Sequence, residues 1–248
     1  MARSPCRQCG FTYHCICHCY WPLESQLQCV LVMHENEAAR QSNTGKLVKA
    51  ALPHTQIEIW QRKQPPQALL DSWARGDVSP WLLFPSDDAI PADRLFADPA
   101  RSVSCENRLV SCAETLAATN APRAPLQFVV LDATWQQARK ILNKSPWLNR
   151  LPRVGLPSTA ASQYTLRRNQ PEGHLCTSEA VSALLRSRGD VDAATQLNHF
   201  LAHFMESYEA DRHHQTEPLP AAKVADAKRM NKKTPSTARC HARRLSGL

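Results

Sequence analysis

Short apolar segments rich in β-branched residues recur along the chain and alternate with segments that have helical spacing. The clearest is Gln-Phe-Val-Val-Leu at 127–131, which has the length and composition of a buried strand. Strands that alternate with helices form a mostly parallel sheet covered by helices on both faces. The sequence therefore predicts an α/β fold with strands at 28–34, 56–60, 81–84, 127–131 and 153–156.

The segments between these strands predict the helices and the place of a ligand site. Thr177 is a candidate N-cap, and Gly76 is a candidate C-terminal stop. Ligands of open parallel sheets bind beyond the carboxyl ends of the strands. We therefore expect the loops after Phe84, after Leu131 and around Leu156 to line a site. The expected helices are 44–52, 66–75, 134–143, 178–188 and 192–211.

Cysteines cluster at the N-terminal end, with the spacing C-x2-C-x5-C-x-C-x-C over residues 6–19. Two such thiolate pairs can close a tetrahedral zinc site, which leaves no position for water and is therefore structural. We predict that Cys6, Cys9, Cys15 and Cys17 bind Zn²⁺, with Cys19 as the rival ligand. Unligated thiols are the alternative. Cys29 is expected in the core, and the remaining cysteines (Cys105, Cys112, Cys176 and Cys240) are expected to be inert.

The formal net charge of +8 is concentrated at the C-terminal end, where residues 221–248 hold eight Lys or Arg and one Asp. A basic segment of this kind favours nucleic-acid contact, although a solvated extension is the alternative. We expect three parts: a zinc-binding head at 1–22, an α/β body at 23–215 and a basic tail at 216–248. No membrane span or secretory signal is recognisable, so a cytoplasmic location is expected.

Asp132 follows the strand at 127–131 and precedes a predicted helix that begins at Thr134. A carboxylate at the carboxyl end of a buried strand is a candidate general base. The alternative is a role in capping the next helix. Trp135 is either a core residue or a surface on which a base or adenine stacks. The pattern alone leaves both pairs of alternatives open.

Several blocks of the sequence occur in an order typical of one family. Residues 131–140, Leu-Asp-Ala-Thr-Trp-Gln-Gln-Ala-Arg-Lys, resemble the D-x-T-W signature of the DTW-domain family. Residues 6–17 resemble its C-x2-C…C-x-C head, and residues 34–47 resemble its H-x-x-E-x-x-R-x-x-N-T-G-x-L segment. Its F-P-S-x-x-A, Y-x-L-R and T-x-E-A blocks are matched at 84–89, 164–168 and 175–180. The resemblance extends from residue 6 to about residue 205.

The resemblance implies a tRNA-uridine aminocarboxypropyltransferase whose fold is related to the knotted SPOUT methyltransferases. Such an enzyme transfers the 3-amino-3-carboxypropyl group of S-adenosylmethionine to N3 of a uridine, here expected in the variable loop, and releases methylthioadenosine. The implied partner is tRNA, with no DNA or membrane partner, and both a monomer and a homodimer stay open. The chain departs from the family pattern at Glu35, where proline is expected, and in having Cys19.

The resemblance also implies which residues carry the chemistry. The signature residues Asp132, Thr134 and Trp135 form the expected catalytic group. The residues expected to bind S-adenosylmethionine are Phe84, Pro85, Ser86, Leu131, Leu156, Ser158, Leu175, Thr177 and Glu179. Those expected to contact RNA are Arg40, Asn43, Thr44, Arg139, Arg167 and Arg168. Local capping by Ser86 and Thr177, and an ion pair of Arg40 with Glu37, are the structural alternatives.

Two other functions remain open from the sequence. An RNA methyltransferase could use the same pocket with S-adenosylmethionine, because only the carbon that faces the base would differ. A non-catalytic, zinc-dependent RNA-binding protein would bind no S-adenosylmethionine.

Overall fold

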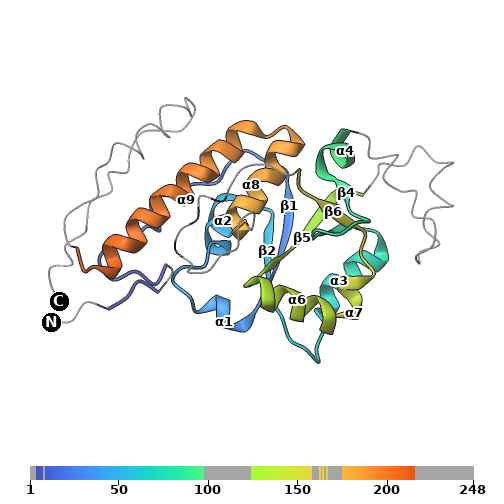
Figure 1. Ribbon diagram of the computed structural model, residues 1–248, viewed down its shortest axis with the longest axis horizontal. Helices are drawn as coiled ribbons and strands as arrows, with labels where there is room; N and C mark the ends of the chain where they lie inside the picture. The colour runs from blue at the N-terminus through green and yellow to red at the C-terminus, as the bar shows by residue number, and fades with distance from the viewer. Residues whose placement is uncertain are drawn as a thin grey trace.

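The computed structural model describes residues 4–7, 9–97, 124–157, 162, 164, 166 and 175–215. In this part of the chain the centre is a six-stranded sheet whose neighbouring strands are all parallel (Figure 1). The strand order is β2-β1-β5-β3-β6-β4. The strands are β1 Gln28–Met33, β2 Thr55–Ile59, β3 Ser79–Leu83, β4 Ile90–Pro91, β5 Leu126–Asp132 and β6 Arg153–Gly155. The predicted α/β class with a parallel sheet is confirmed.

Helices cover both faces of the sheet because the central strands are apolar on both sides. Successive residues of a strand point to opposite faces, so Leu31 of β1 joins one core cluster while Val30 and Val32 join the other. The first face is covered by α2 Gly45–Ala51, α4 Ala92–Ala97, α8 Thr177–Arg188 and α9 Val191–Arg212. The second face is covered by α3 Gln67–Arg75, α6 Trp135–Lys144 and α7 Pro146–Asn149 (Figure 1).

All five expected strands and all five expected helices are present, with ends displaced by at most two residues. One predicted cap is wrong. The N-cap of α8 is Cys176 and not Thr177, because the Thr177 hydroxyl donates to Asp132 and the Glu179 carboxylate accepts from the Cys176 amide. The sequence also missed β4 and the short helices α1 (Glu35–Ala38), α4 and α7.

Several predictions lie outside the described residues, namely the basic tail at 216–248, Ser158, Arg167, Arg168, Cys105, Cys112 and Cys240. The knot and the domain boundaries stay predictions. Among the described helices, none combines the length and the apolar character that crossing a bilayer would require.

The Cys-rich head packs along the C-terminal half of α9, as Figure 1 shows. Phe11 is buried against Phe204, with ring centroids 5.7 Å apart, and it meets the edge of Tyr208 at 6.2 Å. Ile16 is buried in the same cluster. Side chains of α9 therefore supply much of the core of the head, as expected for a segment too short to form a core of its own.

A single carboxylate fixes the head to the last turn of α9. Asp211 is 7% exposed, and it accepts hydrogen bonds from the main-chain amides of Thr12, Tyr13 and His14 at 2.5–3.1 Å. A buried carboxylate near a helix C-terminus is unfavourable, because desolvation and the helix dipole both oppose the negative charge. The three amides offset this cost, so the carboxylate and the loop depend on each other.

Replacing Asp211 with Ala should lower the free energy of unfolding by about 1–3 kcal/mol, because it leaves three half-buried amides without their acceptor. Glu209→Ala is the matched control. Glu209 lies on the same turn, but its side chain is 45% exposed and pairs only with the exposed Arg212 and His213 among the described residues. Its loss should therefore cost less than about 0.5 kcal/mol. Chemical denaturation measures both values, and equal costs would contradict the docking role of Asp211.

Candidate functional site

Asp132 is the last residue of β5, one of the two central strands, and it is only 1% exposed. It lies in register with Met33 of β1, and its carbonyl accepts from the His34 amide at 3.2 Å. The capping alternative for Asp132 does not apply. Thr134 caps α6, accepting from the Gln137 amide at 3.3 Å while Gln137 Oε1 accepts from the Thr134 amide at 2.9 Å. The Asp132 carboxylate therefore serves something other than the next helix.

The carboxylate of Asp132 is held by side chains from two other segments. Asn43 Nδ2 donates to Oδ2 at 2.8 Å, and Thr177 Oγ1 donates to Oδ1 at 2.6 Å. Asn43 lies in the loop before α2 and is fully buried, whereas Thr177 begins α8. Both bonds stabilise the ionised form of the carboxylate. We call these three residues, together with Gly45, the Asp132 clasp.

Glu179 organises the chain that leads into α8. Its carboxylate accepts from the Cys176 amide at 2.8 Å, the Tyr164 amide at 3.2 Å and the Ser162 hydroxyl at 2.7 Å. Tyr164 in turn donates its hydroxyl to the Ser42 carbonyl at 2.6 Å. The predicted cofactor residue Glu179 thus shapes the site through the main chain around it.

The aromatic residue of the signature lies at the surface. Trp135 is 40% exposed, and it stacks on Phe84 with ring centroids 5.4 Å apart and an interplanar angle of 10°. The Arg153 guanidinium lies over the ring of Phe84, 6.0 Å from its centroid. The core alternative for Trp135 is therefore excluded. An exposed flat ring at the first turn of α6 is a surface on which a planar base could stack.

The strand ends bring several predicted cofactor residues to one edge of the sheet. Phe84, Leu131 and Leu156 lie at the carboxyl ends of the neighbouring strands β3, β5 and β6. Pro85 and Ser86 continue from β3, and the buried Ser86 hydroxyl has no hydrogen-bond partner among the described residues. A buried polar atom without a partner is costly. Its position fits contact with a polar group of a bound ligand. Leu175 is half-buried just before α8.

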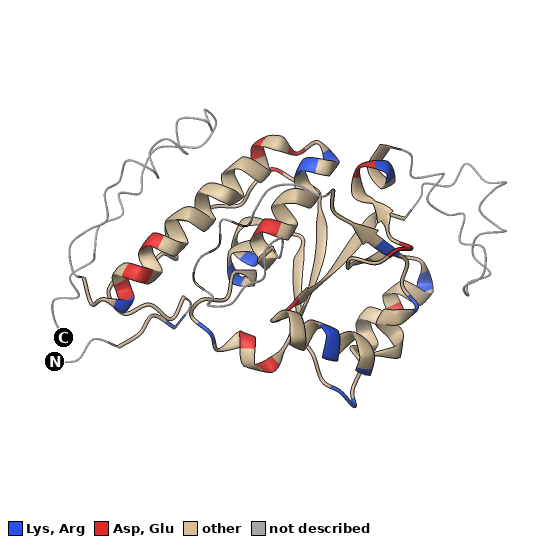
Figure 2. Ribbon diagram, in the orientation of Figure 1, with Lys and Arg blue, Asp and Glu red and all other residues tan. Residues whose placement is uncertain are grey.

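The residues predicted to contact RNA have different surroundings. Asn43 and Thr44 are buried, and Thr44 Oγ1 accepts from the Ser178 amide at 3.4 Å. Both side chains therefore bond inside the protein, Asn43 to Asp132 and Thr44 to Ser178. Arg40 lies just beyond α1 and forms the ion pair with Glu37, at 3.2 Å. Arg139 is exposed on α6, a helix that carries Lys and Arg but no acidic residue (Figure 2).

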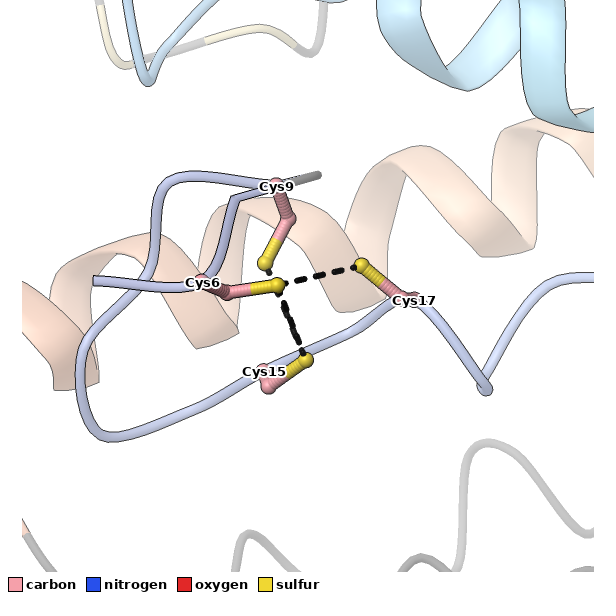
Figure 3. Close-up of side chains that lie close together, drawn as sticks. All are labelled: Cys6, Cys9, Cys15 and Cys17. Carbon is pink, nitrogen blue, oxygen red and sulfur yellow. Dashed lines mark hydrogen bonds between the residues drawn. The ribbon is translucent and has the colours of Figure 1, made fainter. Parts of the chain in front are cut away.

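The four cysteines predicted as ligands converge in the head (Figure 3). Their sulfurs all lie within 4.8 Å of one another, with Cys6–Cys17 and Cys6–Cys15 at 3.6 Å and Cys9–Cys15 at 3.9 Å. Zinc–sulfur bonds of about 2.3 Å in a tetrahedron place sulfurs about 3.8 Å apart. The cluster therefore has the donor set and the dimensions to hold a soft metal ion. The rival ligand Cys19 is buried but lies outside this group.

Burial raises the pKa values of thiols both inside and outside the cluster. It raises the pKa of Cys9 to about 11 and raises the pKa of Cys17 still further. A bound cation would offset this cost, because it favours thiolates. Burial also raises the pKa values of Cys29 and Cys176 to about 12. Burial therefore keeps both thiols protonated near neutral pH, which fits the core position predicted for Cys29 and the inert role predicted for Cys176.

A DTW domain model matches residues 3–209 of the chain. The chain belongs to the DTW family. Among curated proteins it is similar to "tRNA-uridine aminocarboxypropyltransferase 2" of Drosophila melanogaster, with 26% identity over 204 residues, 76% of this chain and 69% of the relative. No solved structure matches the chain.

The signature of the DTW family divides into three structural tasks in this chain. Asp132 enters the clasp, Thr134 caps α6 and Trp135 presents its ring to solvent.

Sequence reasoning missed Lys46, which lies half-buried beside the clasp. Burial lowers the pKa of Lys46, while the charges of Cys9 and Asp132 act in the opposite direction. Its position in the Asn-Thr-Gly-Lys block was the available signal. Lys46 thus lies between the head and the site.

Gly45 leaves the space that the Asp132 carboxylate occupies. A Cβ at this position would lie far inside contact distance of Asp132 Oδ2. Gly45→Ala should therefore lower the free energy of unfolding by about 1–3 kcal/mol, although the same change in an ordinary helix stabilises. Gly155→Ala is the control, since its Cβ would meet Ala89 at an ordinary 3.4 Å. Chemical denaturation compares the two, and a Gly45→Ala protein as stable as wild type would contradict the clasp geometry.

Proposed function

We propose that this protein transfers the 3-amino-3-carboxypropyl group of S-adenosylmethionine to N3 of a uridine in tRNA, in the variable loop, and releases methylthioadenosine. The observation that carries the proposal is the Asp132 clasp. It holds the signature carboxylate of a DTW chain at the carboxyl end of a central parallel strand, where sheets of this class bind ligands. The name of the Drosophila relative supports aminocarboxypropyl transfer to a uridine and tRNA as the partner.

The donor pocket is proposed along the carboxyl ends of β3, β5 and β6. Phe84, Pro85, Ser86, Leu131, Leu156, Ser158, Leu175, Thr177 and Glu179 are the proposed lining. Ser86 is the best candidate for a hydrogen bond to the bound donor, because its buried hydroxyl has no hydrogen-bond partner among the described residues. Thr177 and Glu179 are bonded within the protein, so we propose that they hold the pocket wall in place. When bound, S-adenosylmethionine supplies a sulfonium that activates the γ carbon of its methionine part.

The proposed role of Asp132 is to accept the N3 proton of the uridine. As N3–H gives up its proton to the carboxylate, N3 forms a bond to the γ carbon, and the carbon–sulfur bond breaks with its electrons remaining on sulfur. A carboxylate offers about four acceptor positions, and the two bonds from Asn43 and Thr177 use one on each oxygen. These bonds fix the orientation of the Asp132 carboxylate. Trp135 is the proposed surface on which the uracil ring stacks.

Asp132→Asn should lower the rate of methylthioadenosine release roughly 10²- to 10⁴-fold, because it removes the proton acceptor while keeping the side-chain volume. Binding of S-adenosylmethionine, measured by calorimetry, should change little. Asp71→Asn, an exposed carboxylate on α3, is the control and should keep wild-type activity. Undiminished release by Asp132→Asn would refute the base. Mass spectrometry of the tRNA nucleosides tests the reaction itself, since a methylated uridine from wild type would indicate a methyltransferase.

We propose further that Cys6, Cys9, Cys15 and Cys17 bind one structural Zn²⁺. The ion would connect the two ends of the loop 9–15, whose middle is docked on Asp211. Four thiolates leave no open position, so the metal would stabilise the head and take no part in transfer.

Elemental analysis of the purified protein should find one zinc per chain. Cys6→Ser should lose most of this zinc, because three thiolates bind more weakly than four. Cys19→Ser should retain it, because Cys19 lies outside the group of four. If Cys19→Ser releases zinc as fully as Cys6→Ser does, the proposed ligand set is wrong.

A further inference from the structure

We propose that a cation surface formed by α6, α7 and the loop after β2 binds the phosphate backbone of the tRNA; this inference rests on the proposed function. The surface consists of six exposed side chains, Arg62, Lys63, Arg139, Lys140, Lys144 and Arg150. Of these, only Arg139 was predicted from the sequence. The others lie far apart in the chain or on the outer side of a helix, and the fold brings them to one side of the sheet (Figure 2).

One contact joins the loop to the helices of the surface, and a second holds α7 on α3. Trp60 Nε1 donates to Ser145 Oγ at 2.9 Å, which fixes the start of the loop at 61–66 to the junction of α6 and α7. Trp147 of α7 packs on Trp73 of α3 with ring centroids 5.9 Å apart. All three tryptophans pack against the cluster on the second face of the sheet, which contains Ile141. The surface is therefore built on packed elements, which keeps its charges at fixed positions.

The surface is free of carboxylates within its own segments. Helices α6 and α7 and the loop at 61–66 contain no Asp or Glu. Elsewhere in the described part of the chain, Arg40, Arg75, Arg153, Arg188 and Arg212 each pair with an acidic side chain. None of the six cations of the surface has such a partner among the described residues.

The positive charge of the surface is not a property of the whole body. Residues 1–220 hold 22 basic and 21 acidic side chains, so six cations without an acidic partner among the described residues form a local concentration of positive charge. Unpaired cations repel one another in the free protein, and a polyanion removes that repulsion when its phosphates release their counterions.

The surface is continuous with the proposed site. α6 begins at Trp135, three residues after Asp132, and Arg139 follows Trp135 by one helical turn on the same side of the helix. Lys140 and Lys144 continue along α6, which is about 15 Å long. A strand whose uridine stacks at Trp135 would therefore run its backbone along α6. Phosphate contacts of this kind fix position and register without reading sequence.

The test removes three charges from the surface and compares a matched loss elsewhere. The test protein is Arg62→Gln/Lys140→Gln/Lys144→Gln, and the control is Arg75→Gln/Arg94→Gln/Arg212→Gln, whose side chains are also exposed. Both proteins have the same net charge. All six positions are exposed, so the free energy of unfolding should stay within about 0.5 kcal/mol of wild type. Fluorescence anisotropy with an unmodified tRNA transcript, over a series of salt concentrations, gives the affinity and its salt dependence.

The test protein should bind tRNA at least about tenfold more weakly near 100 mM salt, and the slope of log affinity against log salt should fall by about 2–3. The control should stay within about twofold. With saturating tRNA, the test protein should release methylthioadenosine at nearly the wild-type rate, so that KM rises and kcat is kept. Equal losses of affinity in the two proteins would overturn the surface.

Failure of the surface is distinguishable from failure of the proposed function. If wild type makes the modified uridine but both variants bind tRNA alike, the surface is wrong and the reaction stands. If wild type binds tRNA through the surface but releases no methylthioadenosine, the reaction is wrong and the surface stands as an RNA-binding surface.

Discussion

The hydrogen bonds of Asn43 and Thr177 to Asp132 join three parts of the chain that meet at one edge of the sheet. Asp132 ends a central strand, Asn43 leads into α2 and Thr177 begins α8. Removing any one of the three side chains leaves buried polar groups without partners, which costs more than the bond itself contributes. Gly45 completes the arrangement because only a residue without a Cβ leaves room for the carboxylate. The geometry of the proposed active site is thus also a condition for packing the two helices on the sheet.

The head and the proposed site are connected by short steps, although they perform different tasks. The charges of both Cys9 and Asp132 act on Lys46, and Tyr164 packs in the same cluster as Phe11 while donating to the Ser42 carbonyl. Residues 43–47 therefore lie against both the head and Asp132, because Leu47 packs in the cluster of the head while Asn43 donates to the carboxylate.

Local pattern was sufficient for the strands because the central strands are continuous apolar runs, and it was sufficient for α3 and α6 because these helices have marked polar faces. Strand ends then located Asp132, Phe84 and Leu156 at one edge, since parallel strands end together. Pattern could not show that Asn43 and Thr44 face inward, because that depends on Asp132 and Ser178, which are remote in sequence. The same limit applies to Thr177, whose hydroxyl leaves the helix end for Asp132. The cations at Arg62 and Lys63 were also missed, because only packing through Trp60 places them beside α6.

The docking of residues 12–14 on Asp211 spans 197–199 positions of the chain, and this separation has a consequence for biosynthesis. Ribosomes add about 5–20 residues per second, so the head waits roughly 10–40 seconds before its acceptor exists. During that interval α9 does not yet cover the thiols of the head. Early binding of the proposed Zn²⁺ by the nascent segment would protect them from oxidation, and α9 would then pack on a head that already holds this ion.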